Sequence, residues 1–339
     1  MDDITTGEAM TLLELSRQTG PDGKLIRPVD IAIKKNEWAS YAKFMEANDQ
    51  ASHTYVQLIQ KPTGAWRSVN ENITRSQGRS RQAVERIKML EDENVIDEAI
   101  IDIHQNPKQF RATQDDIFQA GLFATLAEAF IYGNEDEDPD ELHGLASRDD
   151  WNALADTNIV NAGGSGSDVM SVWVIKFGMG GVYFVYPKGS TLGGSSDDKG
   201  YGSVGFGMYR KDRGIQRVNA STSSTNAYYA YTTHHKIKLG LVCENPRCVQ
   251  RICNIESSGS SNILDPDMIV DAIANMDDTE GAVILMNRTA FAQLRKNAMN
   301  RVNVFYDPDK PWGNGMTQVF DNMPLVLTDA LAIDEDALT

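Results

Sequence analysis

The stretch Asn106-Pro-Lys-Gln-Phe-Arg-Ala-Thr, continued to Phe130-Ile-Tyr-Gly133, decides the fold because it carries the signals of one long helix from start to end. Asn106 is a favourable N-cap, proline is tolerated at the next position, and Gln109 stands where a capping box needs it. Gly133 can adopt the left-handed conformation that closes a helix, and the acidic run after it ends in a proline. About 26 residues between these signals predict a rod of roughly 39 Å.

One face of this rod is apolar. Phe118, Leu122, Leu126 and Phe130 recur at helical spacing, whereas the charged residues fall largely on other faces. A buried core helix is the simplest interpretation of such a pattern.

The composition is that of a folded chain without a membrane span. The 339 residues are 41% hydrophobic and 24% charged, which allows a real core and two or three subdomains. The longest apolar run, Gly281 to Met286, is far too short to cross a bilayer, and the acidic start predicts no secretory signal. We therefore expect synthesis and folding in a cytoplasm, with Cys243, Cys248 and Cys253 as reduced, packed thiols.

Charge is distributed unevenly along the chain. The net charge of −16 argues against tight binding of nucleic acid. Between Lys61 and Lys88, however, there are seven basic residues and two acidic ones, whereas Glu91 to Asp102 and Glu135 to Asp150 are strongly acidic. One hypothesis is that the basic segment of one copy lies over the acidic surface of its neighbour; the alternative is an ordinary solvated surface.

The basic segment reads as a long hairpin. His53 to Gln60 alternates as a strand, Lys61 to Gly64 forms a turn, and Ala65 to Asn70 runs back. The return leg from Ile73 to Arg81 is polar and has little to bury on its own body. A hairpin without its own core usually lies on a partner.

Helical spacing is expected on both sides of the hairpin. Upstream, amphipathic patterns predict short helices at Glu8 to Gln18 and at Asn36 to Ala47. Downstream, Arg81 to Glu93 resumes helical spacing through Val84, Ile87 and Leu90.

Beyond the rod, two antiparallel strand pairs are expected. Val169 to Phe177 and Val182 to Tyr186 are joined by a glycine-rich turn, and Ala227 to Val242 and Arg247 to Ile255 are joined at Asn245-Pro246. The chain then ends as a small α+β unit. The elements expected in that unit are a helix from Asp265 to Met276, a strand from Ala282 to Met286, a helix from Arg288 to Met299 and strands at Val302 to Phe305, Thr317 to Phe320 and Leu325 to Thr328.

No motif predicts catalysis, a cofactor or a metal. Gly200-Tyr-Gly202-Ser-Val-Gly205 matches the dinucleotide fingerprint in letters, but neither a parallel strand before it nor a helix after it is predicted. Ser196 to Lys199 has the spacing of a serine acylase without its companion motifs. His234 and His235 are adjacent on a predicted strand and point to opposite faces, so they cannot chelate one metal together. We expect no enzyme.

Five phrases in order resemble a known family. They are Trp66-Arg67-Ser-Val-Asn70-Glu-Asn-Ile73, Phe130-Ile-Tyr-Gly133-Asn134, Pro139-Asp-Glu-Leu-His-Gly144-Leu145, Ile159-Val-Asn-Ala-Gly163-Gly164-Ser-Gly-Ser-Asp168 with Ser171-Val-Trp-Val, and Tyr186-Pro-Lys-Gly-Ser190. Together with a basic hairpin, a long rod and a terminal α+β unit, they resemble the major capsid proteins of tailed bacteriophages, which have the Hong Kong 97-type fold, and within these the podovirus-associated group.

The resemblance implies an α+β fold with five parts: an N-terminal arm (1–50), an extended loop with a following helix (51–93), a peripheral domain (94–255) with spine helix 107–132 and antiparallel strands, an axial domain (256–325) and a C-terminal tail (326–339). It implies a virion shell of pentamers and hexamers, assembled in the host cytoplasm around double-stranded DNA that it does not bind tightly. A separate scaffolding protein, a portal and optionally a cement protein would be its partners. The residues expected at inter-subunit contacts are Trp66, Arg67, Asn70, Arg75, Arg79, Arg81, Arg86, Phe118 and Leu122.

Two other functions stay open from the sequence alone. One is an encapsulin-like nanocompartment shell, which packaged enzyme instead of DNA would indicate. The other is a soluble enzyme that binds a nucleotide at Gly200 to Gly205, which a thermal shift with NAD or ATP would reveal.

Overall fold

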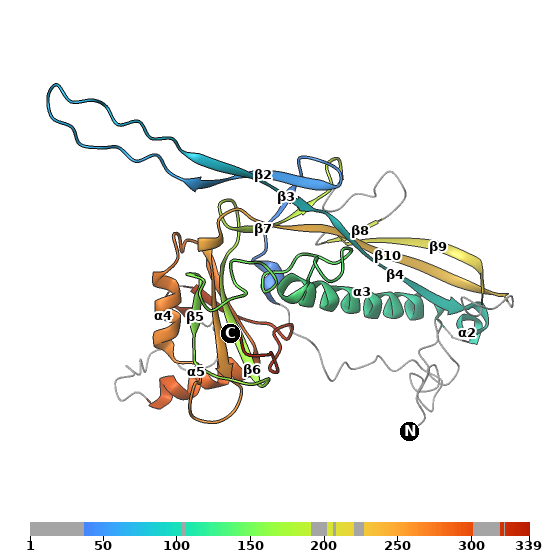
Figure 1. Cartoon of the computed structure of the whole chain (residues 1–339). Helices are drawn as coiled ribbons and strands as arrows, with labels where there is room; N and C mark the ends of the chain where they lie inside the picture. The colour runs from blue at the N-terminus through green and yellow to red at the C-terminus, as the bar shows by residue number, and fades with distance from the viewer. Residues whose placement is uncertain are drawn as a thin grey trace, which may run out of the picture. The chain divides into compact units, whose positions relative to one another are not determined.

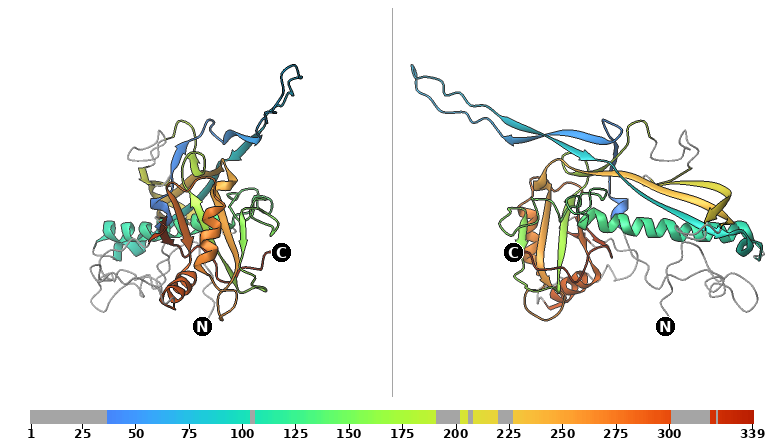
Figure 2. Two further views of the ribbon diagram at one scale, coloured as in Figure 1. Left: turned by 90° about the vertical axis from the view of Figure 1, so that its left-hand side faces the viewer. Right: turned by 45° about the vertical axis from the view of Figure 1, so that its right-hand side comes forward.

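The computed structural model describes residues 37–103, 106–190, 202–205, 208–219, 227–300, 319–321 and 323–339. These residues form two compact units, drawn in Figures 1 and 2. Among them, unit 1 is built from segments 89–128 and 190–238, and unit 2 from the segments before, between and after these. The helix expected at Glu8 to Gln18 and the strand expected at Val302 to Phe305 lie outside the described residues.

Unit 1 contains most of the predicted rod. Helix α3 (Pro107–Tyr132) has the predicted bounds, and its residues to Glu128 belong to this unit. At its start, the Gln109 backbone N–H donates to Asn106 Oδ1 at 3.5 Å and the Asn106 side chain donates to Gln109 Oε1 at 3.2 Å, as in a capping box. The short helix α2 (Glu98–Ile103) precedes it.

Gly133 ends α3 for a different reason from the one expected. It is not among the residues with a left-handed backbone. Instead, a Cβ atom at Gly133 would lie 2.1 Å from the carbonyl oxygen of Leu142, and one at Gly144 would lie 2.7 Å from the backbone N of Gly133. The backbone at the end of the helix and the backbone of residues 142–144 lie so close together that neither glycine has room for a side chain.

The other described residues of unit 1 form mainly a sheet. Strand β8 (Gly202–Gly205) pairs antiparallel with β9 (Met208–Asn219), which pairs antiparallel with the first part of β10 (Ala227–Cys243). Strand β4 (Lys88–Asp97) also pairs with β10. The helix expected over Arg81 to Glu93 was therefore wrong, because strands β3 (Arg79–Arg86) and β4 occupy most of that segment.

Unit 2 contains two sheets and a hairpin. In the first sheet, β1 (Phe44–Glu46) lies parallel to β7 (Val182–Tyr186), which pairs antiparallel with the last residues of β10. The helix expected at Asn36 to Ala47 is thus a 3-10 turn, Glu37–Ser40, followed by a strand. This segment is anchored by Trp38, which stacks on Phe130 at a ring distance of 4.8 Å.

The second sheet is mixed, in the order β13-β14-β12-β6-β11-β5. The pairs β6 with β7 and β10 with β11, expected from the sequence, do not form, because the glycine turn after β6 and the turn after β10 carry the chain from one sheet to the other. Strands β6 and β11 were expected to share the peripheral domain with the spine. They belong instead to the mixed sheet, in which β6 lies between β11 and β12 of the terminal unit. The strands are β5 (Ile159–Asn161), β6 (Val169–Lys176), β11 (Val249–Glu256), β12 (Ala282–Met286), β13 (Val319–Phe320) and β14 (Met323–Leu327).

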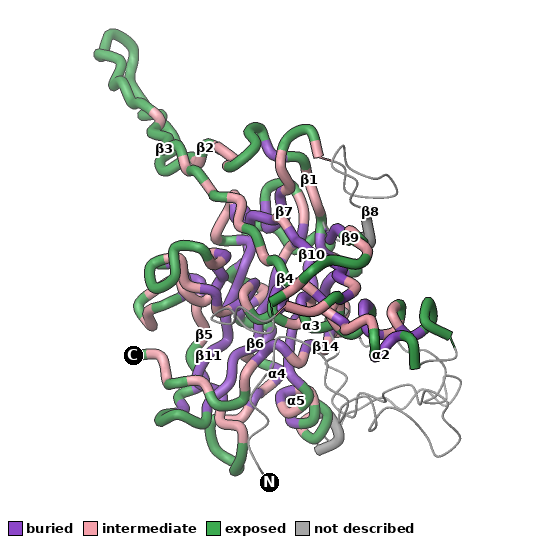
Figure 3. Tube along the Cα trace, turned by 90° about the vertical axis from the view of Figure 1, so that its right-hand side faces the viewer, coloured by how far each residue is buried: buried purple, intermediate pink, exposed green. Residues whose placement is uncertain are grey.

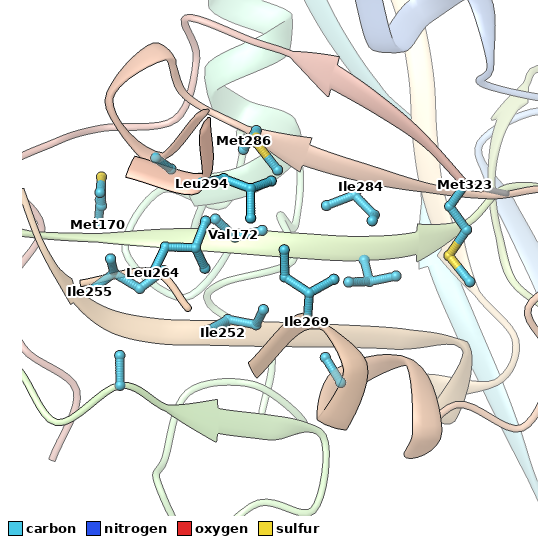
Figure 4. Packing of buried hydrophobic residues seen from close by; sticks show 14 of the residues in the cluster. Met170, Val172, Ile252, Ile255, Leu264, Ile269, Ile284, Met286, Leu294 and Met323 are labelled. Carbon is cyan, nitrogen blue, oxygen red and sulfur yellow. The ribbon is translucent and has the colours of Figure 1, made fainter. Parts of the chain in front are cut away.

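Alternation along β6 gives this sheet two different faces. Val172 and Val174 point into an apolar core with Ile269 of α4 (Pro266–Ala274) and Leu294 of α5 (Arg288–Asn300), as Figure 4 shows for most of the cluster. Helix α5 begins at the predicted residue. Helix α4 begins one residue after Asp265, which caps it by accepting a hydrogen bond from the Asp267 backbone N–H at 3.1 Å. This core joins the mixed sheet to both helices.

The other face of the sheet carries a buried polar cluster that holds the end of the chain. Glu335 accepts hydrogen bonds from Tyr132 and Ser171, each at 2.6 Å, and pairs with Arg251 at 2.9 Å. The Arg251 guanidinium also donates to the carbonyl oxygen of Trp151 at 2.9 Å. The segment expected as a tail is thus packed, and it joins the end of α3 to the sheet.

Replacing Glu335 by Ala is expected to destabilise the subunit strongly. Arg251 and Glu335 have side chains only 7% and 8% exposed, so the variant leaves a buried guanidinium without its carboxylate. Loss of one partner of a buried pair costs about 3–5 kcal/mol, which denaturant unfolding of unassembled subunits would measure. Asp334→Ala, at an exposed neighbouring position, should change the free energy of unfolding by less than about 0.5 kcal/mol; equal effects of the two variants would contradict this account.

Candidate inter-subunit surfaces

The predicted hairpin is present and extends away from the sheets of unit 2 (Figures 1 and 2). Its strands are β2 (Ser52–Gln60) and β3 (Arg79–Arg86), paired from Ser52 opposite Arg86 to Gln60 opposite Arg79. The 18 residues between them, 61–78, contain no further strand. Hence the return leg expected at Ala65 to Asn70 is irregular chain, while the outgoing strand has nearly the predicted bounds.

The outer part of the hairpin exposes large apolar side chains. Trp66 is 105% exposed, Val69 89% and Ile73 73%. Val56, Leu58 and Ile59 on β2 are also exposed, and Figure 3 shows the outer part of the hairpin in the colour of exposed residues. Alternate residues of a strand point to opposite faces, so neither face of this ribbon is covered.

The base of the hairpin, in contrast, is packed. Tyr55 and Ile87 contact a small core formed by Ala47, Tyr183, Val185 and Val242. The Gln57 amide donates to the carbonyl oxygens of Cys243 at 3.2 Å and Glu244 at 3.1 Å. Exposure therefore begins where these contacts end.

Hydrogen bonds within the tip shape its turn. The Ser68 backbone N–H donates to Glu71 Oε2, and Arg67 Nη1 donates to the Glu71 carbonyl oxygen, both at 2.8 Å. Asn70 has a left-handed backbone with φ of 71°, which asparagine tolerates better than most residues. Of the expected contact residues, Arg67 and Asn70 therefore also determine the shape of the tip.

Most basic side chains of the hairpin have no carboxylate partner in the described part of the chain. Arg81 donates to Gln57 Oε1 at 2.7 Å, and no described carboxylate pairs with it. The others without such a pair are Lys61, Arg67, Arg75 and Arg79.

Arg86 and Lys88 are different, because both pair with Glu135 of the same chain, at 3.4 and 2.9 Å. Lys88 Nζ also donates to the carbonyl oxygen of Pro139. Sequence reasoning placed Arg86 at a contact between subunits and missed this partner, which lies 49 positions away with no spacing signal to mark it.

The two expected spine residues face their own unit. Leu122 is buried, and Phe118 is partly buried with its ring stacked on His235 of β10 at 6.3 Å. They have less surface to offer a neighbour than the hairpin residues.

A buried carboxylate fixes the spine to its sheet. Asp115 Oδ1 accepts a bond from Asn94 of β4 at 2.8 Å and lies 3.6 Å from His235 Nε2. Its Oδ2 lies 3.4 Å from Arg210 Nη1. Burial alone would raise the pKa of this carboxyl, but His235, Asn94 and Arg210 more than offset that effect and hold it below its ordinary value.

Other sequence candidates have structural roles or stay outside the described residues. The described part of the dinucleotide-like motif, 202–205, is strand β8 in an antiparallel pair, which is not the turn before a helix that the fingerprint needs. His234 lies 3.2 Å from Glu91, on the opposite side of the strand from Asp115. Ser196 to Lys199 lies outside the described residues.

The cysteines are free and buried, as predicted. Burial raises the pKa of Cys243 to about 12 and that of Cys253 to about 11, which makes both poor nucleophiles. Within the described ranges, no group of three or more His, Cys, Asp or Glu residues is arranged to hold a metal ion. Nor does any described helix have the length and apolar character needed to span a bilayer.

Comparisons with known proteins agree with the resemblance seen in the sequence. A family model described as major capsid protein GP7 matches residues 20–339. The solved structure of bacteriophage Epsilon15 is 24% identical, with a TM-score of 0.74 over 100% of this chain and 99% of that chain, which confirms the expected α+β phage capsid fold.

More distant structures are also similar. The holo-SrpI encapsulin complex of Synechococcus elongatus PCC 7942 is 9% identical, with a TM-score of 0.45 over 73% of this chain and 96% of that one. The capsid of bacteriophage JBD30 decorated with minor capsid protein trimers is 11% identical, with a TM-score of 0.44 over 97% of both chains. No curated protein sequence matches the chain.

The Asp115 cluster predicts an acid-sensitive contribution to stability. A carboxyl whose pKa is lowered in the folded state stabilises that state above its unfolded pKa, and the contribution is lost as the pH falls through the lower folded value. We expect Asp115→Asn to lower the free energy of unfolding by about 1–3 kcal/mol at pH 7, where it loses charge-assisted bonds. Denaturant unfolding of unassembled subunits from pH 7 to 3 should show this difference shrinking below about pH 4, whereas Asp116→Asn, at the exposed next position, should show none.

Proposed function

The chain belongs to the family of major capsid protein GP7, and from this premise we propose that the β2–β3 hairpin is the part of each subunit that reaches a neighbouring copy. The protein is a structural subunit of a virus capsid shell, and many copies of this chain assemble to form that shell. The family match favours this role over the encapsulin-like compartment and over the nucleotide-binding enzyme.

The single observation that carries the proposal is the apolar surface of the hairpin. Trp66, Val69 and Ile73 are left in water although the same chain buries 56 hydrophobic residues among those described. Burial of an apolar side chain stabilises by about 1.5–3 kcal/mol for residues of this size. In a shell, a neighbouring copy would bury these side chains.

Charge supports the same direction of contact. Arg67, Arg75, Arg79 and Arg81 lie on the exposed hairpin, while Glu91 to Asp102 and the loop from Glu135 offer acidic surface on every copy. Opposed charges on two patches of one chain steer copies together and select register. The proposed partner of the arginines is this acidic surface on the neighbour.

We assign the finer parts of the function by the same family resemblance. The resemblance gives residues 94–255 to the peripheral domain and 256–325 to the axial domain. Because β6 and β11 share the mixed sheet with β12, we propose instead that α3 with strands β8 to β10 forms the peripheral domain, and the mixed sheet with α4 and α5 the axial domain. The shell would be the icosahedral head of a tailed phage, built from pentamers and hexamers in the host cytoplasm, with a scaffolding protein and a portal from other chains and a cement protein where one is present. The net charge of −16 supports enclosing double-stranded DNA without holding it, and no enzymatic step is proposed.

Charge reversal on the hairpin tests the proposed contact. Arg75→Glu together with Arg79→Glu should leave the unfolding temperature of the unassembled subunit unchanged, because both side chains are exposed and have no described carboxylate partner. We expect the initial rate of shell assembly, followed by light scattering and electron microscopy, to fall at least about tenfold at low salt. The effect should shrink at high salt.

A matched control is Arg247→Glu, which reverses an exposed charge of unit 2 that pairs with Asp277. It should leave the assembly rate within about twofold of the parent at low salt, since exposed pairs contribute little. Normal assembly of the hairpin variant at both salt concentrations would contradict the charge contact.

The proposed burial of Trp66 can be observed directly. Trp66→Ala should not change the unfolding temperature, because the side chain is fully exposed, yet it should reduce shell yield at least tenfold, as expected for an aromatic anchor. The tryptophan emission of Trp66, obtained as the difference between the spectra of the parent and of Trp66→Phe, should shift to shorter wavelength on assembly. An unchanged spectrum would mean that Trp66 stays in water in the shell.

A further inference from the structure

Strand β3 places a carboxylate on its inward face. Ala83 and Glu85 of this strand, and Ile87 just after it, are less exposed than Val84 and Arg86 between them. The alternation therefore puts Glu85 where an apolar side chain would be expected. Its side chain is only 12% exposed. A carboxylate in such a position needs a partner.

The partner is Arg148, whose side chain is 9% exposed. Arg148 Nη1 lies 2.7 Å from Glu85 Oε1, and Nη2 lies 3.3 Å from Oε2, which is a two-point contact. The same guanidinium donates to the carbonyl oxygens of His143 at 3.1 Å and Leu241 at 2.9 Å. One planar group thus ties β3 to a loop and to strand β10.

The second strand of the hairpin is held at the same point. The Tyr55 hydroxyl of β2 donates to Glu85 Oε1 at 3.2 Å. Burial and the neighbouring Glu85 raise the pKa of Tyr55, so the hydroxyl stays a donor. Burial alone would lower the pKa of Arg148, but Glu85 more than offsets this and the guanidinium stays charged.

A two-point contact of a planar guanidinium fixes orientation, whereas apolar contacts permit sliding. The orientation of the hairpin base matters because the hairpin is long, so a small rotation at the base displaces the tip by a large distance. About 19 residues separate Glu85 from Trp66, which at about 3.3 Å per residue allow a reach of roughly 60 Å. A rotation of about 5° at the base would then move the tip by about 5 Å, enough to displace a side chain from a pocket on a neighbour.

We propose that the buried Glu85–Arg148 pair, with Tyr55, is a positioning element that sets the direction in which the hairpin leaves its subunit and so aims the tip at the neighbouring copy. This inference rests on the proposed role of the hairpin. It assigns the pair to assembly rather than to the stability of the subunit.

The main test replaces the pair by apolar side chains of similar length, Glu85→Met with Arg148→Met. Such replacements are often neutral for stability, because no buried charge is left alone. Spin labels at Ser68→Cys in the tip and Ser258→Cys on an exposed loop of unit 2 would report the direction of the hairpin in unassembled full-length subunits, since the native cysteines are buried. We expect the distribution of label distances to broaden at least twofold and the assembly rate to fall at least tenfold, with the unfolding temperature within a few degrees of the parent.

A second variant decides the question if the double variant does not fold. Glu85→Asp keeps the charge but withdraws the carboxylate by one methylene, so it should fold, broaden the distances and slow assembly. The matched control, Arg247→Met with Asp277→Leu, removes an ion pair on the surface of unit 2 and should change neither readout.

Three results would overturn the proposal. In the first, Glu85→Asp has the label-distance distribution and the assembly rate of the parent. In the other two, a variant of the pair changes only one of these readouts, either the distance distribution or the assembly rate, and keeps the parental value of the other. A control that changes as much as the test variant would also overturn it. If the parent itself formed no shells, the proposed function would fail, while the distance measurement would still decide whether the pair sets the direction of the hairpin.

Discussion

Two strands cannot shield an apolar side chain from water on their own, and this constraint governs the hairpin. The hairpin consists of two strands and an irregular tip with no further layer to cover it, so Trp66, Val69 and Ile73 of the tip remain exposed in the isolated subunit. The chain is not short of apolar material, because its mixed sheet is well covered by α4 and α5. The apolar exposure of the hairpin is therefore local, and it indicates that another molecule binds there.

A projecting ribbon is useful only if its base is rigid, and unit 2 supplies that rigidity in two ways. Apolar packing of Tyr55 and Ile87 closes the base, and hydrogen bonds from Gln57 and Arg148 fix it to backbone carbonyls. The buried cluster around Glu335 joins the end of α3 to the mixed sheet in the same manner. In both places a charged pair connects segments that are distant in sequence.

The sequence predicted elements whose signals are local and failed where pairing is long-range. Helix α3 was predicted to the residue because Asn106, Gln109 and Gly133 mark its ends, although Gly133 is required for close approach of two backbones rather than for a left-handed turn. The spacing of Val84, Ile87 and Leu90 suggested a helix, but pairing with β2 and β10 overrides a pattern of three residues.

Partners of strands and charges were harder still. The residues of β6 and β7 give no signal that the two strands belong to different sheets, although a glycine turn joins them. For the candidate surface, the exposed hairpin and its arginines were predicted from charge and polarity, whereas Arg148 and Glu135 were missed. Their partners lie 63 and 49 positions away, at separations that carry no periodic signal.

The interrupted path of unit 1 has a consequence for synthesis. Its spine segment, 89–128, is made long before strand β10, whose residues to Lys238 complete the unit. At about 5–20 residues per second, the ribosome needs roughly 5–20 s to cover the intervening hundred or so residues. During that interval Phe118 has no His235 to stack on. The side of the nascent spine that carries Phe118 therefore stays without its sheet until β10 has been made, so unit 1 closes only after most of the chain has left the ribosome.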